Sequence, residues 1–117
     1  MMYDINNVFA KIINKAIPCD LIFEDDKVIF FHDISPQAKI HILGVPKAEV
    51  INLSDFVQKC DQSEVYYFFQ KISEVIKKFN LQKTGYRLIT NEGKDSNQEV
   101  PHFHIHILGG ENLGGLR

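Results

Sequence analysis

Polar and apolar side chains alternate along residues 102–108, where three of the five histidines of the chain lie. The histidines occupy every second position, and large apolar residues stand between them. A period of two is typical of a β-strand with one apolar face, so we predict a strand here whose apolar side chains pack on a core. His102, His104 and His106 then share the opposite face, with Cα atoms about 6.6–6.8 Å apart.

Four other apolar runs are bounded by turn-forming residues and predict further strands, at residues 21–24, 28–33, 39–45 and 86–91. With the histidine strand they make five. Helical segments separate the first three strands from the last two. This order is typical of an α+β fold with a mostly antiparallel five-stranded sheet and two main helices.

Three segments carry apolar residues at helical spacing. A short helix is predicted from an asparagine at 6 or 7 to about residue 15, and a second from a polar residue at 52 or 54 to about residue 60. The longest stripe predicts a helix that starts near Asp61, where Glu64 completes a capping-box pair, and ends near Asn80 in a left-handed cap. Tyr66 and Tyr67 widen its apolar arc beyond what a surface helix needs, which favours a subunit interface.

Length and composition limit the classes of protein that fit. The 117 residues fit one domain, predicted over 1–117 with its core at about 8–110 and a short mobile tail at 111–117. The net charge is −2 and no basic run occurs, which argues against a nucleic acid polymer as the partner but not against a mononucleotide. Cys19 and Cys60 match no metal or redox spacing and favour a reducing compartment, with a disulfide as the open alternative.

Membrane association is not expected. No stretch approaches the roughly 20 apolar residues of a membrane span. The N-terminal residues show no cationic region followed by an apolar run. A cytoplasmic location is therefore the expectation.

Three imidazoles on one strand face admit three interpretations. A plain solvent-exposed face is disfavoured, because such faces more often carry Lys, Glu or Thr. Histidines at i and i+2 can bind one zinc ion, and a catalytic zinc needs three protein ligands. Alternatively, the central histidine is a nucleophile whose neighbours donate hydrogen bonds and carry protons. The spacing alone does not separate the last two.

The alternation of histidines and apolar residues resembles the signature of the histidine-triad (HIT) superfamily of nucleotide hydrolases and transferases. Two further blocks follow the expected order: residues 31–38 with His41 after them, and residues 91–93 with Gln98 after them. The resemblance covers most of residues 8–110 and is greatest to the Hint branch, the histidine triad nucleotide-binding proteins. It implies a HIT-like fold, a homodimer across which the sheet extends, and a purine nucleotide or nucleoside phosphoramidate as ligand.

The resemblance also implies a reaction at the histidines. His104 attacks the phosphorus of a nucleoside 5′-phosphoramidate, the amine leaves, and water then releases the nucleoside monophosphate from nucleotidyl-His104. His106 donates a hydrogen bond to a phosphate oxygen, while His102 and His41 set the tautomers of their neighbours. One member of the cluster is expected to carry a proton while His104 stays neutral.

Other positions are assigned to the nucleotide by the same resemblance. Asp33 offers two acceptor oxygens to the ribose hydroxyls, with a turn-stabilising role as the alternative. Asn91 and Gln98 offer donors to the phosphate, with stabilisation of their loop as the alternative. The full set is Phe9, Ile12, Phe31, Asp33, Ile34, Leu43, Asn91, Gln98, Glu99 and Val100.

Departures from the family pattern lie near both ends of the chain. Some relatives bind structural zinc through a CxxC pair in the N-terminal helix, but Asn7 and Ala10 stand at those positions, so we expect no metal and no cofactor. Many relatives carry serine where this chain has Glu99, whose carboxylate would repel a phosphate unless it turned away. Alternative functions are a dinucleoside polyphosphate hydrolase, a non-catalytic nucleotide-binding or adaptor protein and, last, a metal hydrolase.

Overall fold

The computed structural model of the protein describes residues 2–116, so Met1 and Arg117, the ends of the predicted domain, lie outside the described range. Five strands and four α-helices occur within this range. The strands are β1 Asp20–Glu24, β2 Val28–His32, β3 Ile40–Pro46, β4 Tyr86–Ile89 and β5 Ile105–Gly109. The helices are α1 Val8–Ile13, α2 Leu53–Lys59, α3 Gln62–Lys78 and α4 Leu81–Thr84, with a 3-10 turn at Lys94–Ser96.

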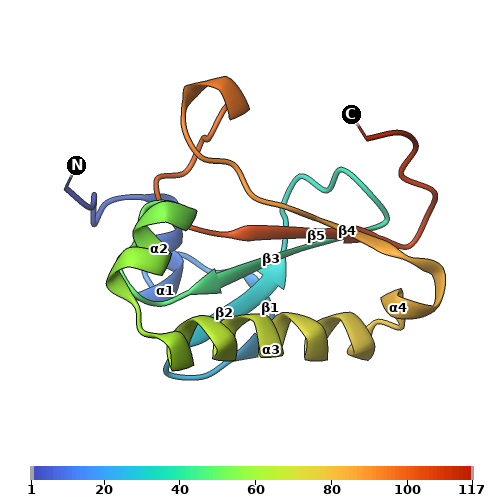
Figure 1. Ribbon diagram of the computed structural model, residues 1–117, viewed down its shortest axis with the longest axis horizontal. Coiled ribbons are helices and arrows are strands. Elements are labelled where there is room, and N and C mark those ends of the chain that lie inside the picture. The colour runs from blue at the N-terminus through green and yellow to red at the C-terminus, as the bar shows by residue number, and fades with distance from the viewer. Residues whose placement is uncertain (1, 117) are drawn as a thin grey trace.

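The strands form one antiparallel sheet in the order β1-β2-β3-β5-β4, which confirms the predicted class (Figure 1). β5, the histidine strand, lies one place in from the edge strand β4. It begins at Ile105, so the prediction of a strand from His102 is wrong at that end. The pairing with β3 ends where Gly44 meets Ile105, and the backbone N–H of Phe103 donates instead to the carbonyl of Val50, outside the sheet.

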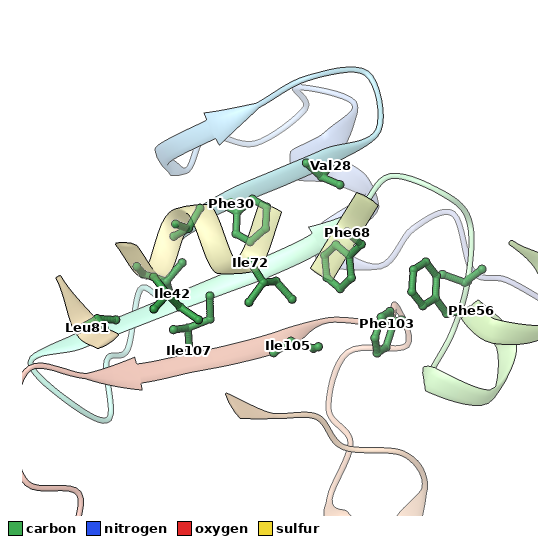
Figure 2. Packing of buried hydrophobic residues seen from close by; sticks show 13 residues of the cluster. Val28, Phe30, Ile42, Phe56, Phe68, Ile72, Leu81, Phe103, Ile105 and Ile107 are labelled. Carbon is green, nitrogen blue, oxygen red and sulfur yellow. The ribbon is translucent and has the colours of Figure 1, made fainter. Parts of the chain in front are cut away.

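The larger core fills the face of the sheet that α3 covers. Strand residues of this face interdigitate with the apolar stripe of the helix, as Figure 2 shows. Its fully buried side chains include Phe30, Ile42, Phe68, Phe103 and Ile107. The apolar residues that alternate with the histidines therefore pack on a core, as predicted.

A smaller core fills the opposite face, which α1 covers. Its buried members are Phe9, Ile12, Ile29, Phe31, Leu43 and Val45. Because neighbouring strand residues point to opposite faces, His41 lies on the same side of β3 as Leu43, and Leu43 is the register partner of His106. The histidines of β3 and β5 consequently face α1 rather than α3.

Local hydrogen bonds explain where the helices begin and end. The Asn7 side chain accepts from the backbone N–H of Ala10 at 2.9 Å, and Asp61 with Glu64 forms the predicted capping box of α3. Asn80 is left-handed, with φ of 58°, as expected, but it leads directly into α4, which was not predicted. α1 ends at Ile13, earlier than predicted, because Lys15 also adopts a positive φ of 64°.

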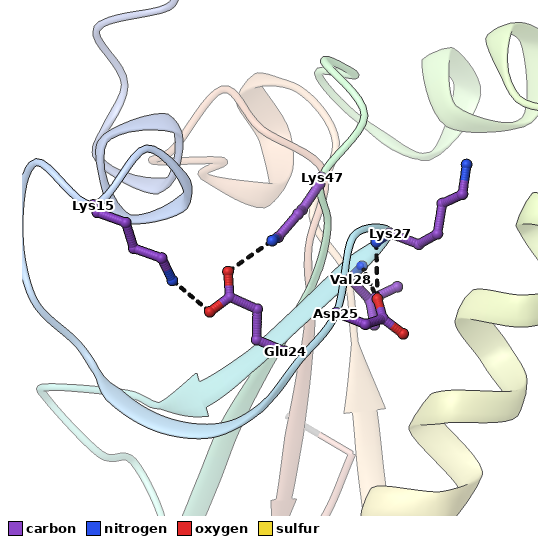
Figure 3. Close-up of polar contacts among 6 residues, drawn as sticks. All are labelled: Lys15, Glu24, Asp25, Lys27, Val28 and Lys47. Atoms are coloured by element: carbon purple, nitrogen blue, oxygen red, sulfur yellow. Dashed lines mark hydrogen bonds and ion pairs between the residues drawn. The ribbon is translucent and has the colours of Figure 1, made fainter.

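Charged side chains tie β1 to both flanking segments (Figure 3). The Glu24 carboxylate, at the end of β1, pairs with Lys15 after α1 and with Lys47 after β3, the latter at 2.6 Å. Asp25 stabilises the following turn by accepting from the backbone N–H groups of Lys27 and Val28 at 2.8 and 2.9 Å. The Lys15–Glu24 pair links the segment after α1 to β1, and the other contacts order the end of β1 and the turn that follows it.

The apolar arc of α3 is only partly explained by the fold. The Tyr67 hydroxyl donates to Asp25 within the chain, so the fold accounts for this side chain without a subunit interface, and the interface on α3 stays a prediction. Tyr66 remains 70% exposed and Phe69 40% exposed. Leu88, on the free edge strand β4, is also exposed.

The segment after β5 contacts the body of the protein. The Glu111 carboxylate accepts from the backbone N–H of Lys39 at 2.6 Å, and Arg87 donates to the carbonyl of Gly114 at 3.1 Å. Cys19 and Cys60 are both free thiols. Across residues 2–116 no helix is long and apolar enough to cross a membrane.

Candidate active site

An open cavity of about 1040 Å³ lies on the α1 face of the sheet. Its walls come from α1, from the segment between β2 and β3, and from the segment between β4 and β5. Every residue predicted to bind the nucleotide lines it, and so do His41, His104 and His106. His102 does not line it, because its side chain is completely buried.

His104 is held by the backbone of its neighbour. Its Nδ1 lies 2.6 Å from the carbonyl oxygen of His102. A carbonyl oxygen can only accept, so Nδ1 carries the proton of the neutral ring. The other nitrogen, Nε2, then keeps its lone pair. Phe9 presses edge-on against this ring at a centroid distance of 4.8 Å and limits its movement.

His106 and His41 form a chain of hydrogen bonds that begins at a backbone amide. The N–H of Gln37 donates to Nδ1 of His41 at 3.0 Å, so that nitrogen is an acceptor. A neutral His41 therefore carries its proton on Nε2, which donates to Nδ1 of His106 at 2.8 Å. His106 in turn carries its proton on Nε2. The chain thus makes His106 a hydrogen-bond donor through that nitrogen.

His102 is fixed at both ring nitrogens by distant parts of the chain. Its Nε2 lies 2.7 Å from the carbonyl oxygen of Pro46, at the end of β3, and so donates to it. Its Nδ1 accordingly accepts from the hydroxyl of Tyr3. His102 was predicted to set a neighbour's tautomer, and it is the backbone carbonyl of this residue, not its ring, that contacts His104.

Burial keeps all four histidines neutral near pH 7. Desolvation lowers the pKa of His102 to about 4, with the bond to Pro46 acting against the shift. Desolvation, reinforced by the neighbouring His104 and His41, also lowers the pKa of His106 to about 4. The pKa values of His41 and His104 are lowered by the same cause, although Asp33 opposes the shift. The expectation that one member carries a proton is therefore wrong for the free protein.

Asp33 follows β2 and points its carboxylate in two directions. Oδ1 accepts from the backbone N–H of Ser35 at 2.8 Å, which is the turn-stabilising bond. Oδ2 lies 3.4 Å from Nε2 of His41. Since His41 is neutral, this is a polar contact and not an ion pair. The carboxylate also lines the cavity, where acceptor capacity remains for a ligand.

Asp33, His41 and His106 form the group of potential metal ligands within residues 2–116, with ligand atoms within 4.8 Å of one another. A neutral histidine that binds a metal through Nε2 carries its proton on Nδ1. At His41 that proton would point at the N–H of Gln37, and two donors facing each other repel. The hydrogen bonds of this group therefore suit a proton-ordered chain better than a metal.

The predicted phosphate-side residues behave differently from one another. The Gln98 amide stabilises its own loop, since it donates to the carbonyls of Ile51 and Val100 at 2.8 and 3.1 Å. Its oxygen accepts from the backbone N–H of Gly93. Asn91 and Glu99 lie along the cavity wall, with Glu99 exposed. Phosphate contacts by these residues stay predictions.

The comparison with known proteins settles the family. A family model of the HIT domain matches residues 14–113. The chain belongs to the HIT family. An uncharacterised HIT-like protein of Rickettsia prowazekii is 48% identical over 98% of this chain and 96% of its own length. A second, from Azospirillum brasilense, is 43% identical over 97% of this chain and 93% of its own.

Solved HIT structures share the whole fold. A histidine triad protein from Clostridium difficile matches with a TM-score of 0.88 at 38% identity, over 99% of this chain and 100% of the other. A HIT family hydrolase from Legionella pneumophila matches with a TM-score of 0.86 at 34% identity, over 93% of this chain and 96% of the other. The predicted HIT-like fold is confirmed.

Several groups that organise this HIT site were missed from the sequence. The amide of Gln37 and the carbonyls of Pro46 and His102 are backbone groups, which have no signature in a sequence. The Thr90 hydroxyl donates to the carbonyl of His104 at 2.8 Å and holds the chain just before β5. Tyr3 was also missed, because nothing in the sequence places residue 3 beside residue 102.

Proposed function

We propose that the protein is a nucleotide-binding hydrolase that cleaves the P–N bond of nucleoside 5′-phosphoramidates, of the AMP–amine type, through a nucleotidyl-His104 intermediate. The observation that carries the proposal is the hydrogen bond from Nδ1 of His104 to the carbonyl of His102, at 2.6 Å. It leaves Nε2 unprotonated on a residue that lines the cavity. Structural neighbours described as HIT family hydrolases support the hydrolytic class.

The first step is attack by Nε2 of His104 on the α-phosphorus. A nucleophilic histidine needs a free lone pair and a second nitrogen held by a partner, and His104 meets both conditions. As the P–Nε2 bond forms and the P–N bond to the amine breaks, the ring becomes positively charged. The carbonyl of His102 then stabilises the Nδ1–H, because a hydrogen bond to a charged donor is stronger.

His106 contributes as a neutral donor. Its Nε2–H is ordered by the chain from Gln37 through His41 and is suited to a phosphate oxygen on which charge develops. A neutral ring cannot give up this proton without becoming an anion, so the departing amine takes its proton from solvent at the open cavity. Water then attacks the phosphorus, Nε2 of His104 recovers its lone pair, and the nucleoside monophosphate leaves.

The nucleotide fits along the cavity according to its chemistry. The apolar side chains of Phe9, Ile12 and Phe31 form a wall suited to a purine face, with Leu43 beside them. The free capacity of the Asp33 carboxylate suits the ribose diol. In this proposed arrangement the α-phosphate lies toward the histidines. The purine preference itself rests on the family resemblance.

We also propose that the protein is a homodimer and resides in the cytoplasm. The exposed aromatic rings of Tyr66 and Phe69 on α3, together with the free edge strand β4, support the dimer. Pairing of two β4 strands would extend the sheet across both subunits and bury Leu88. The two free thiols support a reducing location.

One comparative assay tests the catalytic proposal. The protein is incubated in separate reactions with adenosine 5′-phosphoramidate, with a dinucleoside polyphosphate and with AMP. We expect release of AMP from the phosphoramidate alone, at a rate proportional to protein concentration. Preferential cleavage of the dinucleoside polyphosphate would replace the proposal with the alternative hydrolase. Saturable nucleotide binding without any product would identify a non-catalytic binding protein.

A further inference from the structure

Tyr3 reaches across the fold to the most deeply buried histidine of the cluster. The N-terminal segment passes beside the chain that leads into β5 (Figure 1), and the Tyr3 hydroxyl contacts Nδ1 of His102 at 2.5 Å. The two rings also meet edge to face, with centroids 5.5 Å apart. Tyr3 itself does not line the cavity, so any influence on a reaction there must pass through another residue.

The direction of the Tyr3–His102 bond is determined by the other side of the ring. Nε2 of His102 must donate to the carbonyl of Pro46, 2.7 Å away, so Nδ1 can only accept. The Tyr3 hydroxyl is therefore the donor. Burial raises the pKa of Tyr3 above its ordinary value of 10, so the hydroxyl is protonated near pH 7.

Two anchored nitrogens fix the position of the whole His102 residue. This residue carries the carbonyl that accepts from Nδ1 of His104. Because the ring and this carbonyl belong to one residue, anchoring the ring at both nitrogens restricts the movement of the carbonyl. The hydrogen bond that selects the nucleophilic tautomer of His104 thus depends indirectly, through His102, on the Tyr3 hydroxyl.

The N-terminal segment is built to hold Tyr3 in place. The Asn7 side chain donates to the carbonyl of Asp4 at 2.7 Å while it caps α1 through Ala10. Phe9, two residues further on, contacts the rings of both His102 and His104. Tyr3, Asn7 and Phe9 thus form one continuous support against the buried side of the triad.

We propose that Tyr3 is a positioning residue for the His104 nucleophile and that it acts by donating a hydrogen bond from its hydroxyl to Nδ1 of His102. Its kinetic consequence rests on the proposed function, but its structural consequence does not. Tyr3→Phe removes the donor and leaves the buried Nδ1 without a partner, so the ring shifts or changes tautomer at the expense of the Pro46 bond.

The matched control is Tyr67→Phe. It removes a tyrosine hydroxyl that donates to Asp25 at the β1–β2 turn, on the α3 side of the sheet and away from the cavity. Both variants lose one hydroxyl and keep the ring. A general loss of stability would affect the two alike, whereas a positioning role affects only Tyr3→Phe.

The decisive experiment is NMR of the full chain with ¹⁵N-labelled histidine. In the wild type His102 should show a protonated Nε2 and His104 a protonated Nδ1 that exchanges slowly with water. In Tyr3→Phe we expect the exchange of the His104 proton to rise by about tenfold or more, and formation of nucleotidyl-His104 from adenosine 5′-phosphoramidate to slow by about tenfold, with KM nearly unchanged. Tyr67→Phe should match the wild type in both measurements.

The outcomes separate the two proposals. Wild-type exchange at His104 in Tyr3→Phe, with both nitrogen signals of His102 unmoved, would overturn the positioning role whatever the activity. A wild-type protein that forms no adduct, with the NMR changes as expected, would overturn the proposed function and leave the positioning role standing. Equal changes in Tyr3→Phe and Tyr67→Phe would show a general structural effect and reject the proposal.

Discussion

Acid should destabilise this protein well above the pH at which carboxylates titrate. In the folded protein the pKa of His102 is about 4, whereas its ordinary value is 6.5. Between these two values the unfolded chain binds a proton that the folded chain excludes. Stability therefore rises with pH across the window from 4 to 6.5, and it falls as the solution is acidified through that window.

The magnitude follows from the same two values. Integrating proton uptake from pH 7.5 to pH 5 gives a loss of about 2 kcal/mol from His102 alone, relative to a histidine with no shift. His106 acts in the same direction but contributes less, because it is partly exposed and solvent screens its interactions. Glu24 and Asp25 have lowered pKa values and lose most of their contribution below pH 5, so the loss between pH 7.5 and pH 5 comes mainly from the histidines.

Urea denaturation followed by circular dichroism measures this loss. The free energy of unfolding is determined at pH 7.5, 6.5, 5.5 and 5.0, at one protein concentration and one ionic strength. We expect the steepest decline between 6.5 and 5.0, with an overall loss of at least about 2 kcal/mol. A free energy that changes by less than about 0.5 kcal/mol over this range would refute the neutral, desolvated state of His102.

Other perturbations address the chemistry and the assembly. His104→Asn should abolish the covalent adduct and leave nucleotide binding largely intact; label that maps by peptide analysis to another histidine would contradict the assignment of the nucleophile. His106→Asn should slow turnover by roughly 10²–10³-fold, the cost of one preorganised donor, which single-turnover kinetics would measure. Chelation should leave turnover unchanged; stoichiometric zinc with chelator-sensitive activity would favour a metal hydrolase. Light scattering at micromolar concentration should give twice the chain mass, and a monomer would reject the interface on α3.

The fold was predictable from the sequence because the helix caps and the spacing of apolar residues indicate the same elements. The capping box at Asp61 and Glu64 and the left-handed Asn80 were both foreseen and are both present. The late start of the histidine strand, at Ile105 rather than at His102, was not foreseen. A period of two also fits extended chain outside a sheet, and only the position of partner strands decides that pairing stops at Ile105.

The candidate site was predictable as a list of residues but not as a charge state. Motif resemblance brought His41 and Asp33 together with the triad, and the structure shows both close to His106, which lies beside His104. The His102 ring lies outside the cavity. The expected protonated member does not occur in the free protein, since burial lowers all four histidine pKa values. Burial of an imidazole depends on the packing of distant segments, and a motif carries no measure of it.

The tautomers of the triad depend on groups that no substitution pattern would reveal. At one end the carbonyl of His102 orients His104, and at the other the N–H of Gln37 orients His41 and, through it, His106. A carbonyl can only accept and a backbone amide N–H only donates, so each fixes a direction that a hydroxyl or a second imidazole would leave reversible. The two ends of the cluster therefore differ at Nε2, which carries a lone pair on His104 and a proton on His106. An acceptor at the amide position would reverse His41 and His106 together and leave a lone pair on Nε2 of His106, which could then not donate to a phosphate as proposed.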